Sequence, residues 1–458
     1  MSVALRSRAG AGGRDHGPTP AAVDPAAARR AARPGAAVPE RSRTARVLAV
    51  LAYLVLCVLA LAHAYTPREP DPFAYRASIA ALRDGHLSLT RGQYEALDLR
   101  LAKRADGGGV GIAQWRRTPS GHWASEKNAG YPFLALPFDV MGAVRLAPLF
   151  FGALGCLGLW LGARRWLGEW GAAYAVALFC SQGAVLIMAY ESFMPSCTDA
   201  ALVAGGLGFV LWAMLASDAT TRRREAAGAL GFSMLGAAVA VRWTDLAVLV
   251  VVGIAVLVVR RRVRGIAPRS VLAWCACAAV PIGLAVAYDL AVWHRPFSTG
   301  YRAYDVSFSL GAIGANLGRL PRGWLVGLPV CVVALAGVLR AVHGRRTRRY
   351  GDPAMVHGWV VAVLVGAVVA VFGLYLAYDW TTRLAPGTHF VVLTRFELPA
   401  AGPLALLGAY ALVRLPRPVV VGLLAASFAF GGWQLHRAAT GGFLYSPGPG
   451  PVVGTPPS

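Results

Sequence analysis

The sequence predicts an all-α protein that crosses a membrane many times. Of its 458 residues, 56% are hydrophobic and only 15% are charged, whereas soluble domains have about 45–50% apolar and about 25% charged residues. Mean hydropathy is +0.52. Apolar runs long enough to span a bilayer recur from Arg46 to the C-terminal region, which predicts a polytopic protein and not one with a single anchor.

Both ends of the chain differ in composition from this apolar body. Residues 1–45 are rich in Ala, Arg, Pro and Gly, and residues 437–458 are rich in Pro and Gly. Neither segment has the periodicity of a packed helix, so both are expected to be disordered. The transmembrane domain is expected over residues 46–436. The Arg, Ala, Gly and Pro bias is typical of a high-GC bacterial genome.

We expect about eleven membrane-spanning helices, oriented by the arginines between them. Clusters such as Arg164–Arg165 and Arg222–Arg224 fall in alternate gaps, which predicts that these gaps and the N-terminus are cytoplasmic in a cell membrane. Residues 131–142 are short and interrupted by prolines, so we interpret them as re-entrant or interfacial. The expected spans are about 47–64, 145–163, 171–190, 199–216, 226–241, 243–259, 271–292, 323–341, 358–377, 398–413 and 418–435.

The longest polar interruption, residues 65–131, is predicted to be an extracytoplasmic loop that carries short surface helices. Pro72 to Arg83 reads as one of these, with Asp71 as its N-cap and Gly85 as its stop. Its apolar face predicts that it lies on the membrane surface. That face consists of Phe73, Ala77, Ala80 and Ala81.

Several classes of function are excluded by the same residues. The formal net charge of +23 comes from arginines in short gaps between spans, and a soluble basic domain for nucleic acid is absent from the pattern. The seven cysteines mostly lie in apolar runs, and the nine histidines show no paired spacing. We therefore predict neither a zinc site nor a disulfide framework.

Charged residues gather in the gaps expected on the outer side. Carboxylates there can deprotonate an incoming hydroxyl, while Arg and Lys can hold a phosphate. Each residue also has a purely structural alternative, such as capping for Asp71 or contact with lipid headgroups for the cations. The set comprises Glu69, Asp71, Arg76, Asp84, Glu126, Lys127, Glu191, Asp199, Arg302, Asp305, Asp379, Arg383, Arg395 and Glu397.

Six features in a common order resemble the membrane glycosyltransferases of the GT-C fold, in particular the branch of protein mannosyltransferases and aminoarabinose transferases. The chain has an acidic residue after the first span, followed by an aromatic and a surface helix. It then has a Gly-x-Pro-apolar stretch, a Phe-Ser-Thr-Gly-Tyr turn and an Arg-aromatic-x-Leu-Pro turn. These are Asp71, Tyr75, Pro72–Arg83, Gly130–Pro137, Phe297–Tyr301 and Arg395–Pro399.

The resemblance implies transfer of a sugar from a polyprenyl-phosphate donor to an envelope acceptor on the extracytoplasmic face, with inversion at the anomeric carbon. In the family, an acidic residue in the first outer loop acts as the base or orients the acceptor, and Asp71 is the position that matches. The family usually pairs two adjacent acids, whereas here Pro70 and Pro72 flank Asp71. Candidate substrate-binding residues are Glu126, Lys127, Tyr131, Tyr301 and Arg395. A divalent cation is a possible cofactor, and no other cofactor is predicted.

Two other functions are compatible with the sequence. A transporter or flippase of a lipid-linked substrate would place ionisable groups in mid-span and show repeated halves with broken helices. Here the centres of the spans are nearly free of charge, and one dominant loop breaks any two-fold pattern. A non-catalytic relative that serves in envelope assembly is the third possibility. The sugar, the acceptor and the oligomeric state have no signature in the sequence.

Overall fold

The structure is a computed structural model that describes residues 42–65, 70–102, 112, 114–260, 266–301, 306–346, 355–382 and 394–440. The chain divides into Met1–Glu40 and Arg41–Ser458, and all described residues belong to the second unit. The expected disorder of residues 1–41 and 441–458 lies outside the described residues, as do Glu69, Arg302, Asp305 and Arg383. Helices extend into both segments expected to be disordered, since they begin at Arg43 and end at Ala439.

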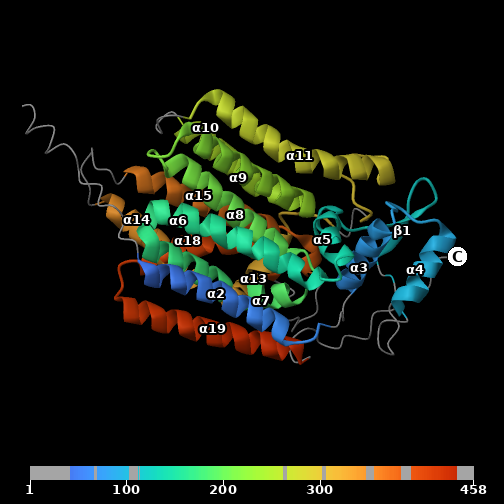
Figure 1. Cartoon of the computed structure of the whole chain (residues 1–458), viewed down its shortest axis with the longest axis horizontal. Coiled ribbons are helices and arrows are strands. Elements are labelled where there is room, and N and C mark those ends of the chain that lie inside the picture. The colour runs from blue at the N-terminus through green and yellow to red at the C-terminus, as the bar shows by residue number, and fades with distance from the viewer. Residues whose placement is uncertain are drawn as a thin grey trace, which may run out of the picture. The chain divides into compact units, whose positions relative to one another are not determined.

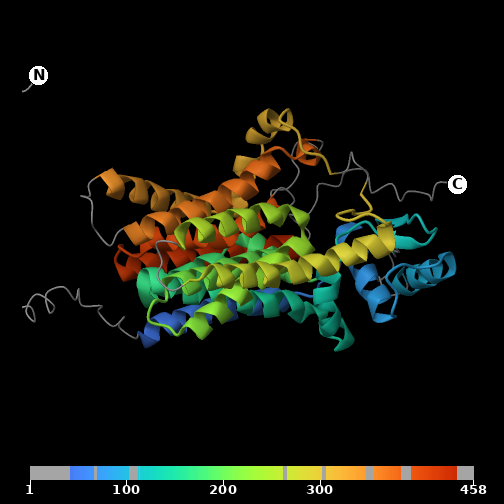
Figure 2. The ribbon, with the colours of Figure 1, turned by 90° about the horizontal axis from the view of Figure 1, so that it is seen from above.

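Within the second unit, long helices lie side by side, and the elements of the predicted loop lie beyond one end of them in both views (Figures 1 and 2). The long helices are α2 (Arg43–Ala62), α6 (Ala147–Cys180), α8 (Ser196–Leu215), α9 (Thr221–Val241), α10 (Leu246–Val259), α11 (Pro268–Trp293), α14 (Val330–Arg346), α15 (Met355–Leu376), α18 (Ala401–Leu412) and α19 (Arg417–Ala439). Shorter ones are α7 (Gly183–Tyr190), α12 (Ala312–Leu317), α13 (Leu320–Gly327) and α16 (Asp379–Thr382), with 3₁₀ turns η1 (Val144–Leu146), η2 (Trp243–Asp245) and η3 (Leu398–Ala400).

A helix occupies each of the eleven expected ranges, but not every one has the length of a span. Among the described residues, six helices are long and apolar enough to cross a membrane, or seven if the pair α13 and α14, bent by 96°, counts as one. The segments Trp243–Val259 and Leu398–Leu412 are apolar but shorter. The chain is therefore a polytopic α-helical membrane protein, and the number eleven stays a prediction.

Large apolar side chains are exposed on the outer helices of the bundle. Leu272 and Leu284 on α11 are 71% and 69% exposed, and Val58 on α2 is 65% exposed. A soluble monomer rarely exposes such continuous apolar faces, whereas lipid tails solvate them. These faces are the lipid-facing surface of the bundle.

Small residues let the two central helices approach to backbone contact. A Cβ added at Gly158 of α6 would lie 2.4 Å from the carbonyl oxygen of Gly205 on α8, and one at Gly208 would lie 2.1 Å from Gly158. Close packing through small residues is the usual way in which helices associate in lipid, where the hydrophobic effect offers little drive. This contact forms the centre of the scaffold.

Two helices are broken inside the bundle, and side chains satisfy the exposed backbone groups. The break between α6 and α7 contains Gln182, whose Oε1 accepts a hydrogen bond of 3.0 Å from the Val330 N–H at the start of α14. Gln434 Nε2 donates to the Val326 carbonyl in α13 over 2.9 Å. The first bond joins the two breaks, and the second reaches the bent pair from α19. Both satisfy backbone groups, because a free peptide group in lipid costs several kcal/mol.

The predicted loop folds into two helices and a hairpin, followed by a short helix. They are α3 (Pro70–Arg83), α4 (Arg91–Ala102), β1 (Trp115–Arg117), β2 (Trp123–Ser125) and α5 (Gly130–Val140). The hairpin, which the sequence analysis did not predict, is antiparallel and pairs Arg116 with Ala124. The predicted re-entrant segment is α5, whose Val140 is 65% exposed.

The apolar face of α3 does not lie on the membrane surface, so that prediction was wrong. Phe73 is 6% exposed, and Ala77, Ala80 and Ala81 are buried. The three alanines pack in a small core with residues of α4 and the hairpin, including Leu97 and Trp115. The face is covered because the rest of the loop folds back over it, which no local pattern indicates. The predicted stop is confirmed, since Gly85 has φ +83° directly after the helix.

Candidate active site

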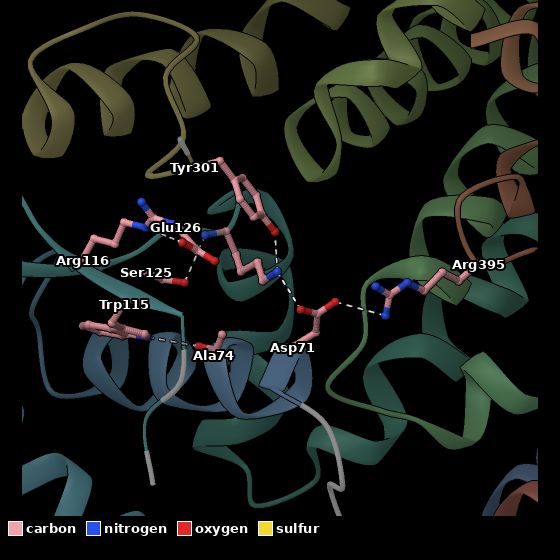
Figure 3. A network of polar contacts seen from close by, with 9 residues as sticks. Asp71, Ala74, Trp115, Arg116, Ser125, Glu126, Tyr301 and Arg395 are labelled. Carbon is pink, nitrogen blue, oxygen red and sulfur yellow. Dashed lines mark hydrogen bonds and ion pairs between the residues drawn. The ribbon is translucent and has the colours of Figure 1, made fainter. Parts of the chain in front are cut away.

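The centre of the site is Asp71, at the start of α3. Its Oδ1 accepts a hydrogen bond of 2.7 Å from Lys127 Nζ, and its Oδ2 lies 3.1 Å from Arg395 Nη1 (Figure 3). The helix begins at Pro70, so Asp71 lies inside the first turn and is not the N-cap that the sequence predicted. Its carboxylate instead joins two segments that are distant along the chain.

Lys127 reaches this carboxylate because β2 ends two residues before it. Lys127 Nζ also donates to the hydroxyl of Tyr301 and lies 4.8 Å from the centroid of that ring. The Phe297–Tyr301 turn packs tightly here, since a Cβ at Gly300 would lie 2.8 Å from the Cα of Glu126. Glycine in this turn thus permits Tyr301 to contact Lys127.

Arg395 approaches from the opposite side, from the segment that precedes η3. Its guanidinium lies 4.8 Å from the ring centroid of Phe396 and 5.5 Å from that of Trp380. Its side chain is 9% exposed, and that of Lys127 is 6% exposed. Both cations are therefore largely withdrawn from water.

The electrostatics of Asp71 follow from this enclosure. Burial by itself would raise the pKa of its carboxyl, but the charges of Lys127 and Arg395 together hold that pKa below its usual range. Asp71 is therefore ionised at neutral pH. Burial raises the pKa of the Tyr301 hydroxyl well above its ordinary value, so Tyr301 stays protonated.

Glu191 is a second carboxyl group in this region. It follows α7, is 3% exposed, and burial raises its pKa to about 7, with Arg395 opposing this shift and Asp71 adding to it. The sequence places Glu191 in an outer turn but supplies no signal for its approach to Arg395. Asp71 and Glu191 thus form a pair of carboxyls whose environments move their pKa values in opposite directions.

A narrow cleft of about 10 Å³ is lined in part by Lys127. Its wall includes Leu82 and Leu87 near the end of α3, Pro132 of α5 and Tyr288 of α11. Leu87 is 43% exposed, so this apolar part of the wall continues to the surface. Polar side chains, among them Ser125, line the rest of the cleft.

Comparison with known proteins identifies the fold. No protein-family model matches the chain, and no curated protein matches it. The crystal structure of ArnT from Cupriavidus metallidurans bound to undecaprenyl phosphate matches with a TM-score of 0.54 and 17% identity, over 84% of this chain and 62% of that chain. The apo state of ArnT matches with a TM-score of 0.51 and 18% identity, over 83% and 61%. An Archaeoglobus fulgidus oligosaccharyltransferase tethered with an acceptor peptide gives a TM-score of 0.49 and 13% identity, over 89% and 56%.

This chain has the GT-C fold. The resemblance seen in the sequence is thus confirmed at the level of fold. The chain spans 62% and 61% of the two ArnT chains, so part of ArnT has no counterpart in the match.

Two residues that were predicted to bind substrate, Glu126 and Tyr131, have partners other than Asp71. Glu126 Oε2 accepts a hydrogen bond of 2.6 Å from Arg116 Nε across the hairpin, and its side chain is directed away from Asp71 (Figure 3). Tyr131 has no exposed surface, and its hydroxyl donates to the Ser192 carbonyl. A ring without exposed surface cannot stack on a sugar, so the structure gives Tyr131 a packing role.

The residues around Asp71 do not form a metal centre by themselves. Among the described residues, no group of three or more His, Cys, Asp and Glu side chains converges in a way that could hold a metal ion. Lys127 and Arg395 contact the two oxygens of Asp71, so this carboxylate has cationic partners already. The divalent cation considered from the sequence stays a prediction.

Proposed function

We propose that this protein is an integral-membrane glycosyltransferase that transfers a sugar from a polyprenyl-phosphate donor to an envelope acceptor on the extracytoplasmic face. The observation that carries the proposal is the Asp71 carboxylate between Lys127 and Arg395, beside a cleft with an apolar wall. A phosphate with a long isoprenoid chain needs both features in one place. The match in fold to ArnT, which was solved bound to undecaprenyl phosphate, supports the same substrate class.

In this proposal, the donor phosphate replaces Asp71 as the partner of the two cations. Lys127 and Arg395 then hold the phosphate by charge-assisted hydrogen bonds, with Tyr301 beside Lys127. The displaced carboxylate loses the charges that lower its pKa, so its affinity for a proton rises. Donor binding thus converts a paired carboxylate into a general base.

Asp71, Lys127 and Arg395 supply the groups that the transfer step needs. The acceptor oxygen forms a bond to the anomeric carbon of the sugar and gives its proton to Asp71, and the bond from this carbon to the phosphate oxygen breaks. The electron pair leaves with the polyprenyl phosphate, whose growing charge Lys127 and Arg395 stabilise. Attack opposite the leaving group inverts the anomeric carbon.

The proposed site faces the outer side of the membrane. We place the N-terminus in the cytoplasm, count eleven spans, and assign α3, α4 and the hairpin to the outer side. The isoprenoid chain would lie against the apolar wall near Leu87. The hexosyl or pentosyl nature of the sugar is left to experiment.

The broken helices favour a transporter as the second candidate. Discontinuous helices are typical of substrate sites in transporters. Here Gln182 of the α6–α7 break bonds to the backbone at the start of α14, and Gln434 of α19 bonds to the backbone of α13. These bonds support a structural role for the breaks and place the enzyme first.

Deletion of the protein, followed by mass spectrometry of envelope glycans and lipid-linked sugars, tests the proposal. An enzyme predicts loss of one glycan and build-up of its polyprenyl-phosphate donor on the outer leaflet. Build-up on the inner leaflet would indicate a transporter. Full complementation by Asp71→Asn would indicate a non-catalytic relative.

A further inference from the structure

Arg395 belongs to a short stretch, Thr394–Glu397, directly before η3. The Glu397 N–H donates to the Thr394 carbonyl over 3.2 Å, and the Ala400 N–H donates to the Glu397 carbonyl over 2.9 Å. A side chain that grips a phosphate must be held by its surroundings within about half an ångström. The backbone of Arg395 therefore needs support from a neighbouring element.

Arg242 supplies that support from the end of α9. Its Nη1 lies 3.2 Å from the carbonyl oxygen of Arg395 and 3.3 Å from that of Phe396. The guanidinium also lies 5.5 Å from the centroid of the Phe396 ring. Arg242 thus donates to two successive carbonyls of the stretch that carries the phosphate-binding arginine.

Arg242 is in turn fixed by residues at the start of α8. Its Nη2 donates to Ser196 Oγ over 3.0 Å, and its Nε lies 3.5 Å from Asp199 Oδ2. The side chain of Arg242 is 13% exposed and that of Asp199 is fully buried. α8 begins at Ser196, so Asp199 lies in its first turn, where it pairs with Arg242.

A second buried carboxyl group lies close to this pair. Asp245 of η2 is 2% exposed, and its charge, like that of Asp199, acts on the guanidinium of Arg242. A buried charge needs an oppositely charged partner, so the ion pair with Asp199 fixes the side chain of Arg242.

We propose that Arg242, anchored by Asp199, is a positioning residue that sets the backbone of Arg395 and thereby the grip of the site on the donor phosphate. This inference rests on the proposed function. Arg242 acts through Arg395 and is distinct from the groups that touch substrate. The role requires arginine, because a lysine keeps the charge but lacks the planar fork that reaches two carbonyls and two side chains.

The test uses the full-length protein in lipid nanodiscs. Arg242→Lys is compared with the wild type and with Arg145→Lys. Arg145 is a matched control because its Nη2 also donates to two carbonyls, those of Ala60 at 3.0 Å and His63 at 2.7 Å, but it belongs to η1 and contacts the end of α2.

The first measurement is hydrogen exchange of the amides of residues 394–400, without ligand. We expect exchange in this segment to become at least about tenfold faster in Arg242→Lys, through loss of charge-assisted bonds, and to be unchanged in Arg145→Lys. Unchanged exchange in Arg242→Lys would overturn the proposal. Asp199→Asn, which keeps Arg242 but weakens its anchor, gives a second variant if the first does not fold.

The second measurement is the affinity for undecaprenyl phosphate. Arg242→Lys should weaken binding about tenfold or more, and should add nothing to Arg395→Ala in the double variant, because both changes act through one contact. Additive losses would contradict a positioning role. If the wild type binds no undecaprenyl phosphate, the proposed function fails, while the exchange measurement still decides the role of Arg242.

Discussion

Asp71 and Lys127 are 56 positions apart and form an ion pair of 2.7 Å at the end of the bundle where α3 and the hairpin lie. The pair exists because the β1–β2 hairpin returns the chain to the start of α3. In this state the carboxylate neutralises a cation that a phosphate would need. Asp71 therefore competes with the proposed donor phosphate for Lys127, and this competition can be measured in variants of either residue.

Asp71→Asn should reduce sugar transfer about 10²- to 10⁴-fold, the usual contribution of a general base. The amide keeps the shape of the side chain but accepts no proton from a hydroxyl. The measurement is the rate of transfer from a polyprenyl-phosphate sugar in reconstituted membranes. Asp84→Asn is the control, since Asp84 pairs with Arg100 at 2.6 Å on the exposed side of the same region. Equal rates in both variants would reject the role of Asp71.

Lys127→Met should raise the KM for the donor and shift the acid limb of the pH–rate profile to higher pH. Lys127 lowers the pKa of Asp71 while burial raises it, so removal of the cation leaves the raising effect and Asp71 gains a proton at higher pH. The measurement is kcat/KM as a function of pH. The control is Glu126→Gln, at the residue directly before Lys127. This variant should leave the acid limb of the pH–rate profile in place, because Glu126 pairs with Arg116.

Glu191 should make the protein less stable as the pH rises from about 4.5 to about 7. Burial raises its pKa in the folded state to about 7 from an ordinary value of 4.5, so the folded state binds more protons than the unfolded state in this window, and stability is lost as the pH increases. The loss is up to about 3 kcal/mol. Thermal unfolding in detergent at several pH values should show a smaller loss of stability with rising pH for Glu191→Gln than for the wild type. The same pH dependence in both proteins would contradict the raised pKa of Glu191.

Gly158→Ala should destabilise the bundle by about 1–3 kcal/mol, because the added methyl group meets the backbone of α8. Gly283→Ala on α11 is the matched control, since a Cβ there has no atom within 4 Å. Thermal unfolding of the two variants should therefore differ. Similar unfolding temperatures would mean that α6 and α8 are not in backbone contact.

Local patterns identified much of this fold. Apolar runs located a helix in each expected range, since a helix in lipid must be continuous and apolar along its length. Glycine after Arg83 located the end of α3, because a residue with positive φ ends a helix at low cost. Asp71, Lys127, Tyr301 and Arg395 were selected from short motifs and from charge at the expected membrane boundary, and the structure brings these four together.

Other features depended on contacts between distant segments. The covered face of α3 needed α4 and the hairpin, and the burial of Tyr131 needed the loop that contains Ser192. Glu126 and Lys127 are adjacent in the sequence but point to different partners, because a residue after a strand can turn to either side.

Composition and periodicity were enough to establish a helical membrane protein with a polar region at one end, since burial in lipid acts on each segment separately. Which charged groups meet, and which carboxyl ionises, was decided only by the tertiary structure. Charge pairing depends on distances of a few ångströms between segments such as Asp71, Lys127 and Arg395, and no local property of the chain sets those distances.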